Sequence, residues 1–275
     1  MHPEILDTIR RALAEDIGPG DVTSQACVPA DRRASGYFLA RQPMILAGVD
    51  LLAVIYDQRG GVEELNILRR DGDYLVEGDR FATVRGPART LLECERLALN
   101  FLQRLSGVAT IAHQFARMVE GTNCKVLDTR KTTPGLRRLE KAAAAAGGVT
   151  NHRIGLFDAI LIKNNHIAAA GGVRQAIENC RRASDLPIEI EVRAIGELHE
   201  ALACGATHLL LDNLSPQQAA EWIRMVDGRA TVELSGGIDL DSVRSYAETG
   251  ADFVSCGAIT HSAKAVDISF RLELL

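Results

Sequence analysis

Six short apolar runs in the second half of the chain each end in polar or small residues, and these could do chemistry together. The runs are KVLDT, AILIK, IEIEV, THLLLD, ATVELS and DFVSCG. The residues in or after them are Asp128-Thr129-Arg130-Lys131, Lys163-Asn164-Asn165-His166, Glu189 and Glu191, Asp212-Asn213, Ser235-Gly236-Gly237 and Ser255-Cys256-Gly257. If the runs are parallel strands of a barrel, their carboxyl ends meet at one rim, where such folds place their active sites. We therefore expect one shared site.

The third run, IEIEV, carries two acidic residues on one face of the predicted strand, Glu189 and Glu191. If both faces of the strand are buried, the two carboxylates point into the interior, where unpaired charge is costly. Lys163 and a divalent metal ion are the expected counter-charges. The alternative is that IEIEV is an edge strand with one face in water.

The stretch between the first two runs is rich in cationic side chains. They are Arg130, Lys131, Arg137, Arg138, Lys141, His152 and Arg153. Arginine binds carboxylate or phosphate through a planar fork, and lysine acts as a point charge. A solvated helix face explains Arg137, Arg138 and Lys141 at least as well as ligand binding does. The other four lie in predicted turns beside the strand ends and indicate an anion site.

Glycines follow the last two runs, in Ser235-Gly236-Gly237 and Ser255-Cys256-Gly257. Glycine lets backbone N–H groups approach phosphate oxygens, and a helix that begins next to them adds partial positive charge. A tight turn needs the same residues, so glycine alone is weak support. Their place on the last two strands favours a phosphate site.

The elements that must position these residues alternate along the chain. Helical patterns near 172–182, 196–204, 216–226 and 240–249 separate the last five runs. Nearly continuous apolar runs between helices predict strands of a parallel sheet that is buried on both faces. Six strands are too few for a closed eight-stranded barrel. We therefore expect an open, incomplete β/α barrel over residues 107–267.

The first part of the chain, residues 1–106, predicts a mixed α/β domain. ASGYFLA, VEELNILRR and RFATVRG predict short strands, and ARTLLECERLALNFLQRL predicts a helix that Gly107 ends. A second helix, VATIAHQFARMV, is expected to run to Gly121. The tail 268–275 alternates apolar and polar residues, so we expect it to return to this domain as a strand.

Composition limits the classes of partner. The chain has 275 residues, 47% of them hydrophobic and 24% charged, and a net charge of −5. That charge disfavours nucleic acid and anionic membranes as partners. The six cysteines are scattered and predict reduced thiols, and no apolar run reaches the length of a membrane span. Neither a signal peptide nor a membrane anchor is expected, which predicts a cytoplasmic protein.

Several motifs together resemble the quinolinate phosphoribosyltransferase family (nicotinate-nucleotide pyrophosphorylase, carboxylating). They are LDTRKTTPGLR, NHRIGLFDAILIKNNHI, IEIEV, LLLDN, ELSGGI and VSCGAIT, with EDIGPGDVTS and ERLALNFLQRLSGVAT earlier in the chain. The resemblance covers nearly the whole chain. It implies a mixed α/β domain followed by an open β/α barrel, in a homodimer whose active sites are completed across the interface. It also implies Mg²⁺-dependent transfer of phosphoribosyl from phosphoribosyl pyrophosphate to quinolinate, giving nicotinate mononucleotide, pyrophosphate and CO₂ in NAD synthesis.

The resemblance also implies a role for each matching residue. Arg104, Arg130, His152 and Arg153 should grip the quinolinate carboxylates, with Arg104 acting in the neighbouring subunit, and Thr129 should line the same site. Lys131 and Lys163 should serve the substrate anions and pyrophosphate. Glu191 and Asp212 should hold Mg²⁺ indirectly, through the substrate, and stabilise positive charge at C1′ of the ribose. The 5′-phosphate should lie on Ser235, Gly236, Gly237, Ser255, Cys256 and Gly257.

Two departures and two rival functions stay open at this point. Asn164 follows Lys163 where the family often has an acid, and the alanine-rich stretch before Gly147 is plainer than usual. One rival is a related transferase that uses another aromatic acid, or a relative linked to molybdate transport. The other is a non-catalytic sensor of phosphate ligands. Glu191 and Asp212 argue against a sensor, because a pure anion binder would not place acids beside its ligand.

Overall fold

The computed structural model describes residues 2–274, which form two compact units that interleave along the chain. The first unit comprises the residues up to His113, Thr132–Gly148 and the residues from Thr260 onward, and the second comprises Gln114–Lys131 and Val149–Ile259. Within the described residues, no helix has both the length and the apolar character needed to cross a membrane.

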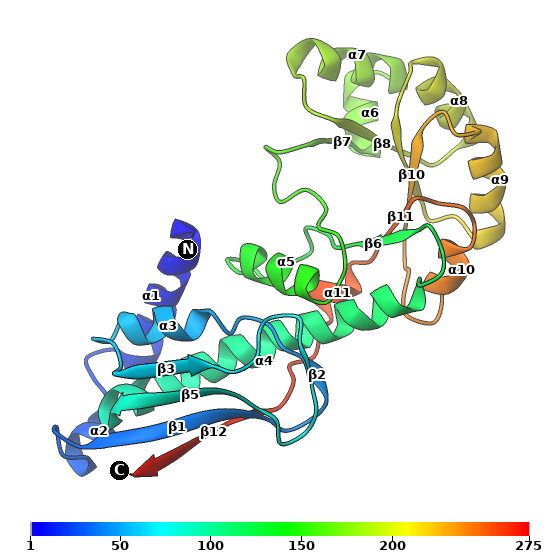
Figure 1. The fold of residues 1–275 in the computed structure, drawn as a ribbon. Helices are drawn as coiled ribbons and strands as arrows, with labels where there is room; N and C mark the ends of the chain where they lie inside the picture. The colour runs from blue at the N-terminus through cyan, green and yellow to red at the C-terminus, as the bar shows by residue number, and fades with distance from the viewer. Residues whose placement is uncertain (1, 275) are drawn as a thin grey trace. The chain divides into compact units, whose positions relative to one another are not determined.

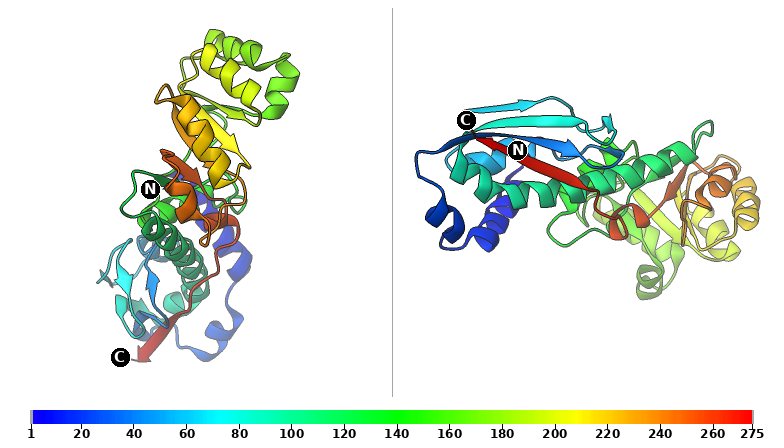
Figure 2. Two further views of the ribbon diagram at one scale, coloured as in Figure 1. Left: turned by 90° about the vertical axis from the view of Figure 1, so that its right-hand side faces the viewer. Right: turned by 90° about the horizontal axis from the view of Figure 1, so that it is seen from below.

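The first unit is built on an antiparallel sheet with the order β12-β1-β5-β3. The strands are β1 (Arg33–Ala40), β3 (Glu64–Ile67), β5 (Arg80–Pro87) and β12 (Ile268–Leu274). Buried and partly exposed residues alternate along β1, as expected for a sheet with one face on the core. The C-terminal strand β12 pairs with β1, so the tail returns to this sheet as predicted (Figure 2).

Helices and a small two-stranded sheet complete the first unit (Figure 1). They are α1 (Pro3–Ile17), α2 (Val22–Cys27), α3 (Leu51–Asp57), α5 (Arg137–Ala146), and β2 (Met44–Ile45) paired with β4 (Tyr74–Leu75). The chain passes from the second unit back to the first within the short helix α11 (Ala258–His261).

The long helix α4 (Ala88–Met118) corrects one expectation from the sequence. It runs without a break through Gly107, where we expected the first of two helices to end. A Cβ atom at position 107 would lie 2.1 Å from the carbonyl oxygen of Lys264. Gly107 is therefore needed for the close approach of this segment, although glycine inside a helix costs about 1 kcal/mol relative to alanine.

The second unit confirms the open β/α barrel, with six parallel strands in the order β6-β11-β10-β9-β8-β7. The strands are β6 (Lys125–Leu127), β7 (Ile160–Ile162), β8 (Ile188–Val192), β9 (His208–Asp212), β10 (Thr231–Ser235) and β11 (Phe253–Ser255). The helices are α6 (Asn164–Ala170), α7 (Val173–Ala183), α8 (Ile195–Ala203), α9 (Pro216–Val226) and α10 (Val243–Ala247) (Figure 1). IEIEV forms β8 between β7 and β9, so the edge-strand alternative is wrong.

The opening of this sheet lies between β6 and β7. Strand β6 pairs with β11, the last strand of the sheet in chain order, and so both β6 and β7 are edges. The segment that connects them returns to β6, where Thr150 forms a parallel bridge with Leu127. The residues that follow Thr150, Asn151-His152-Arg153, are thereby held at the carboxyl end of β6.

Candidate active site

Glu191 and Asp212 lie on the neighbouring strands β8 and β9 of the second unit, at or near their carboxyl ends. The Glu191 side chain is only 5% exposed. A cation that the sequence reasoning missed, Arg193, places its Nη2 2.8 Å from Glu191 Oε1 and 3.5 Å from Asp212 Oδ2. The only signal for Arg193 was its position directly after IEIEV. One guanidinium therefore spans both of the acids expected to act on the substrate.

Lys163 follows β7 and contacts the same acid. Its Nζ lies 4.0 Å from Glu191 Oε2, and its side chain is 52% exposed. The expected counter-charge is therefore present for Glu191, while Glu189 has a different partner, described below. Asn164, which stands where the family often has an acid, is the first residue of helix α6.

The strand ends of β9 and β10 are joined through Asp212. Ser235 Oγ donates to Asp212 Oδ1 (2.7 Å), and Asn213 Nδ2 donates to Asp212 Oδ2 (2.6 Å). Gly236 has a φ of +106°, and a Cβ there would lie 2.3 Å from Asn213 Oδ1. The turn therefore requires glycine at 236 whether or not phosphate binds, while Gly237 next to it is exposed.

Two of the three residues at the carboxyl end of β11, Ser255 and Cys256, are buried. Ser255 is buried, with its Oγ 3.5 Å from the carbonyl oxygen of Leu234. Cys256 is 1% exposed, burial raises its thiol pKa to about 12, and its N–H donates to the Leu127 carbonyl (3.0 Å). Only Gly257 of these three residues is partly exposed.

The helix after Gly237 begins later than the sequence predicted. Helix α10 begins only at Val243, after a loop that Asp239 and Ser242 close by hydrogen bonds, and not directly after Gly237. It has five residues, whereas α11, with four residues, begins directly after Gly257. Backbone N–H groups of the two loops and of the first turn of α11 are therefore the donors that this region offers to an anion.

Asp128, at the end of β6, fixes the loop that carries His152 and Arg153. It is fully buried. Its Oδ2 accepts from Asn151 Nδ2 (2.7 Å) and its Oδ1 accepts from the backbone N–H of His152 (2.7 Å). The sequence placed Asp128 at a strand end without giving it a role, and the structure shows that its carboxylate orients the loop.

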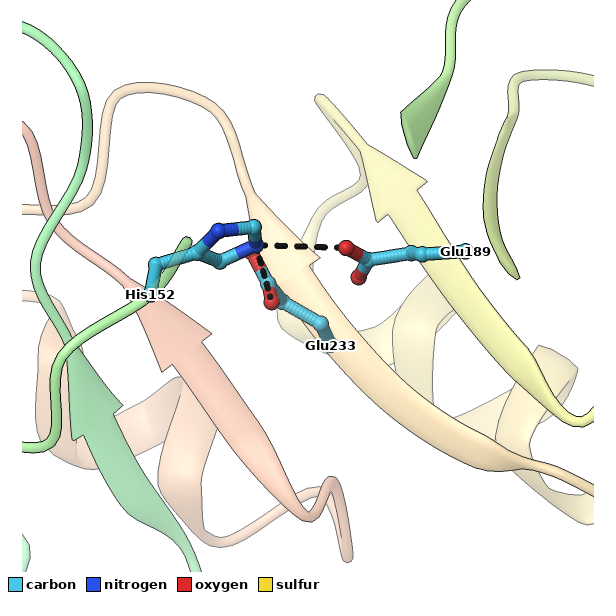
Figure 3. A group of neighbouring side chains, drawn as sticks. All are labelled: His152, Glu189 and Glu233. Carbon is cyan, nitrogen blue, oxygen red and sulfur yellow. Dashed lines mark hydrogen bonds and ion pairs between the residues drawn. The ribbon is translucent and has the colours of Figure 1, made fainter. Parts of the chain in front are cut away.

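His152 reaches from this loop between two acids of the sheet interior (Figure 3). Its Nε2 lies 3.2 Å from Glu189 Oε2 on β8 and 3.4 Å from Glu233 Oε2 on β10. Burial lowers the pKa of His152, but the two carboxylates outweigh it and raise that pKa to about 9. Burial also raises the pKa of Glu189, and the nearby Glu233 adds to the effect. The cluster therefore retains a proton beyond neutral pH.

Glu233 is a second residue that the sequence reasoning missed. The signal was an acid in the middle of the apolar run ATVELS, on a strand with buried residues on both sides of it. In the structure its side chain is 6% exposed and shares the His152 ring with Glu189. An acid inside a buried strand requires a partner, and the partner comes from a distant loop.

One imidazole and two carboxylates can also form a metal site, and the three ligand atoms lie within 4.8 Å of one another. The protonation state of the ring decides against this. Because the two carboxylates raise the pKa of His152 to about 9, the ring is protonated at neutral pH, and Nε2 then has no lone pair for a metal. At neutral pH the three side chains form an ion-paired cluster.

Arg130 and Arg153 bring two guanidinium groups to the same loop region. Arg153 Nη1 donates to the Ala159 carbonyl (3.0 Å). Its pKa is lowered, first by burial and then by the positive charge of Arg130. Thr129 Oγ1 accepts from the N–H of Lys131, whose side chain is exposed. Two like charges in a partly buried place are favourable when an anion lies between them.

Arg104 lies on α4 in the first unit. Its Nε and Nη2 donate to Glu140 Oε1 (3.0 and 2.8 Å), and its Nη1 donates to the Ala263 carbonyl (2.7 Å). Nη2 also donates to the Thr260 carbonyl (2.6 Å). The side chain is 25% exposed, and one N–H of Nη1 is left for another acceptor.

Sequence comparison with known proteins finds relatives that cover both units of the chain. Residues 21–106 and 108–271 match the N-terminal and C-terminal domains described as quinolinate phosphoribosyl transferase. The nicotinate-nucleotide pyrophosphorylase [carboxylating] of Mycobacterium leprae is 43% identical over 97% of this chain and 96% of its own, and the probable enzyme of that name from Bacillus subtilis is 38% identical over 99% and 95%.

Solved structures give the same result for the fold. The crystal structure of NadC from Streptococcus pyogenes has a TM-score of 0.95 at 38% identity, covering 100% of this chain and 99% of that one. The nicotinate-nucleotide pyrophosphorylase of Francisella tularensis has a TM-score of 0.94 at 37% identity, with 99% and 98% covered. With both domains matched over residues 21–106 and 108–271, this chain belongs to the quinolinate phosphoribosyl transferase family.

Proposed function

We propose that this protein transfers the phosphoribosyl group of phosphoribosyl pyrophosphate to quinolinate and releases pyrophosphate and CO₂, giving nicotinate mononucleotide for NAD synthesis. The observation that carries the proposal is the set of side chains at the strand ends of the second unit. Two acids, Glu191 and Asp212, stand on neighbouring strands, and two guanidinium groups, Arg130 and Arg153, stand in the loops after β6. Cations suit the anionic substrates, and acids suit a reaction that develops positive charge.

The quinolinate carboxylates are assigned to the cationic loop. Two adjacent carboxylates need several cations, and Arg130 and Arg153 provide two whose charges already repel each other. Lys131 and Lys163, both exposed, serve the pyrophosphate and the carboxylates as point charges. Thr129 lines this loop through its hydroxyl.

The ribose is assigned to the acids. When pyrophosphate leaves C1′, positive charge develops on the ribose ring, and fixed carboxylates nearby stabilise it. Glu191 is held in place by burial, and Asp212 by Ser235 and Asn213. The 5′-phosphate is assigned to the loops at Ser235, Gly236, Gly237, Ser255, Cys256 and Gly257, where exposed Gly237 and partly exposed Gly257 offer the most accessible backbone.

Decarboxylation follows from the product of the transfer. Once the pyridine nitrogen is bonded to C1′ it is cationic, and it stabilises the electron pair that remains when the adjacent carboxylate leaves as CO₂. The protein then has to hold the ring in place and exclude water. The cationic loop holds the second carboxylate during this step.

We further propose that the reaction uses Mg²⁺. The residues fit a hard cation, because Glu191 and Asp212 on neighbouring strands offer carboxylate oxygens, the ligand type that Mg²⁺ prefers. They would hold the ion through the pyrophosphate of the substrate. When bound, Mg²⁺ neutralises charge on the leaving group.

The proposal also covers the oligomeric state of the protein and its location in the cell. We propose a homodimer in which Arg104 serves the active site of the partner subunit, supported by its partial exposure and its remaining N–H. Because a charge of −5 disfavours nucleic acid and anionic membranes, no such partner is proposed. The cytoplasmic location stays a prediction.

The test is turnover of quinolinate with phosphoribosyl pyrophosphate and Mg²⁺, measuring nicotinate mononucleotide, pyrophosphate and CO₂. We expect the three products in equal amounts, and no comparable rate with nicotinate in place of quinolinate. Turnover of another aromatic acid but not quinolinate would favour the related transferase. Binding of phosphoribosyl pyrophosphate without any product would favour the sensor.

A further inference from the structure

Arg193 lies at the carboxyl end of β8, two residues after Glu191, and its side chain meets that acid. Its backbone N–H donates to Glu197 Oε2 (2.7 Å) in the first turn of α8, which holds the residue at the end of the strand. The Arg193 side chain is 47% exposed, whereas that of Glu191 is 5% exposed. Arg193 is therefore anchored at its backbone while its guanidinium stays accessible.

The guanidinium of Arg193 uses one of its three nitrogens within the described part of the chain. Nη2 lies 2.8 Å from Glu191 Oε1 and donates to Asp212 Oδ2 at 3.5 Å. Among residues 2–274, no acceptor forms a hydrogen bond with Nη1 or Nε. Arginine carries five N–H donors in a rigid fork and no acceptor, so the two on Nη1 and the one on Nε are available to an anion.

The charges around the two acids are balanced before any substrate arrives. Glu191 and Asp212 bring two carboxylates, and Lys163 and Arg193 bring two cationic groups that contact them. An anionic substrate therefore meets no excess of negative charge there. In the proposed function the acids stabilise positive charge at C1′, the carbon to which the leaving pyrophosphate is bonded. A group that contacts both acids is within reach of that leaving group.

We propose that Arg193 binds the pyrophosphate group of phosphoribosyl pyrophosphate through Nη1 while its Nη2 stays on Glu191 and Asp212. The two acids then stabilise C1′ and also orient the guanidinium that receives the departing negative charge. Hydrogen bonds from a guanidinium to phosphate oxygens are among the stronger ones in proteins. The inference rests on the proposed function in placing C1′ at these acids, and it adds a third cation, beside Lys131 and Lys163, for the pyrophosphate.

The test measures dissociation constants by calorimetry, at saturating Mg²⁺, for phosphoribosyl pyrophosphate, inorganic pyrophosphate and ribose 5-phosphate. The first two ligands carry the pyrophosphate group, and the third carries only the ribose and its 5′-phosphate. We expect Arg193→Gln to raise the first two constants about tenfold, the scale of one lost charge-assisted hydrogen bond, and the third less than about twofold. Equal changes for all three ligands, or an unchanged constant for pyrophosphate, would overturn the proposal.

A second pair of variants keeps the test decisive if Arg193→Gln folds poorly. That substitution removes the nearer of the two cations that contact buried Glu191, and a buried charge without its partner is destabilising. In a Glu191→Gln background no carboxylate is left there, and Asp212 still contacts Arg193. Adding Arg193→Gln to this background should again raise the pyrophosphate constant about tenfold. An unchanged constant would mean that Arg193 only neutralises Glu191, and would overturn the proposal.

Arg224→Gln is the matched control, because it removes one positive charge from an exposed position in the last turn of α9. Helix α9 ends just before β10 begins, so Arg224 lies toward the amino ends of the strands, and all three constants should stay unchanged.

The binding measurements use neither quinolinate nor turnover, so they separate this inference from the proposed function. If pyrophosphate binding depends on Arg193 but quinolinate is not turned over, the proposed function fails and the contact with pyrophosphate stands. If the protein turns over quinolinate and Arg193→Gln binds pyrophosphate normally, the inference alone fails. A wild-type protein that binds neither pyrophosphate ligand would overturn both.

Discussion

Glu140 on α5 is fully buried, and Arg104 on α4 meets it with two nitrogens, Nε at 3.0 Å and Nη2 at 2.8 Å from the same oxygen Oε1. Glu140 also accepts from the backbone N–H and the hydroxyl of Thr133 (2.9 and 2.7 Å). Arg104 is thus the charged partner of a buried carboxylate within its own unit. Glu140 belongs to the alanine-rich helix α5, whose contacts the sequence did not predict.

Replacing Arg104 should therefore destabilise the protein as well as affect binding. We expect Arg104→Ala to lower the free energy of unfolding by about 3 kcal/mol, because it leaves Glu140 buried without its cation. Arg117 lies on the same helix as Arg104 and forms an exposed pair with Glu120 in the turn after the helix, so Arg117→Ala should cost less than about 1 kcal/mol. Denaturant unfolding measures both. Equal losses would contradict a structural role for the Arg104–Glu140 pair.

The shared active site can be tested by subunit mixing with a variant that spares Glu140. Arg104→Lys keeps a positive charge near the carboxylate but loses the planar fork. We expect Arg104→Lys and Lys163→Ala homodimers to be nearly inactive, and each mixed dimer to regain about half of the wild-type activity, since one of its two sites has both residues. If heterodimers form and mixing restores nothing, Arg104 serves its own subunit.

Lys163 should be needed for turnover and not for folding. Its side chain is about half exposed, and Glu191 keeps Arg193 at 2.8 Å when the lysine is removed. We expect Lys163→Ala to lower kcat at least about a hundredfold, the usual scale for a lost transition-state contact, with an unchanged unfolding midpoint. The control is Lys125→Ala. Lys125 lies at the amino end of β6, away from the carboxyl ends of the strands, so this variant should keep full activity. A near-normal kcat for Lys163→Ala would remove the residue from the mechanism.

Activity should require a divalent cation. Pyrophosphate is a poor leaving group until its charge is neutralised. Initial rates should fall to background in excess EDTA and return on addition of Mg²⁺ or Mn²⁺. The matching variant is Asp212→Asn, which should raise the Mg²⁺ concentration needed for half-maximal rate. Full activity in EDTA would refute the requirement.

The amino-acid sequence by itself determined the parallel strands and the residues at their ends. Buried parallel strands are nearly continuous apolar runs, and their direction puts every carboxyl end at the same edge, so local pattern sufficed to place Lys163, Glu191, Asp212 and Ser235 together. The count of six strands likewise predicted an open barrel, because closure needs eight.

Only the tertiary structure decided which distant residues meet. Local pattern cannot show that β6 pairs with β11, that the opening lies between β6 and β7, or that the returning loop carries His152 to Glu189 and Glu233. Nor does it show that Gly107 serves a close approach instead of ending a helix. An acidic residue inside a buried strand indicates that the structure must supply an opposite charge. Which residue supplies it depends on long-range packing, which the local sequence does not show.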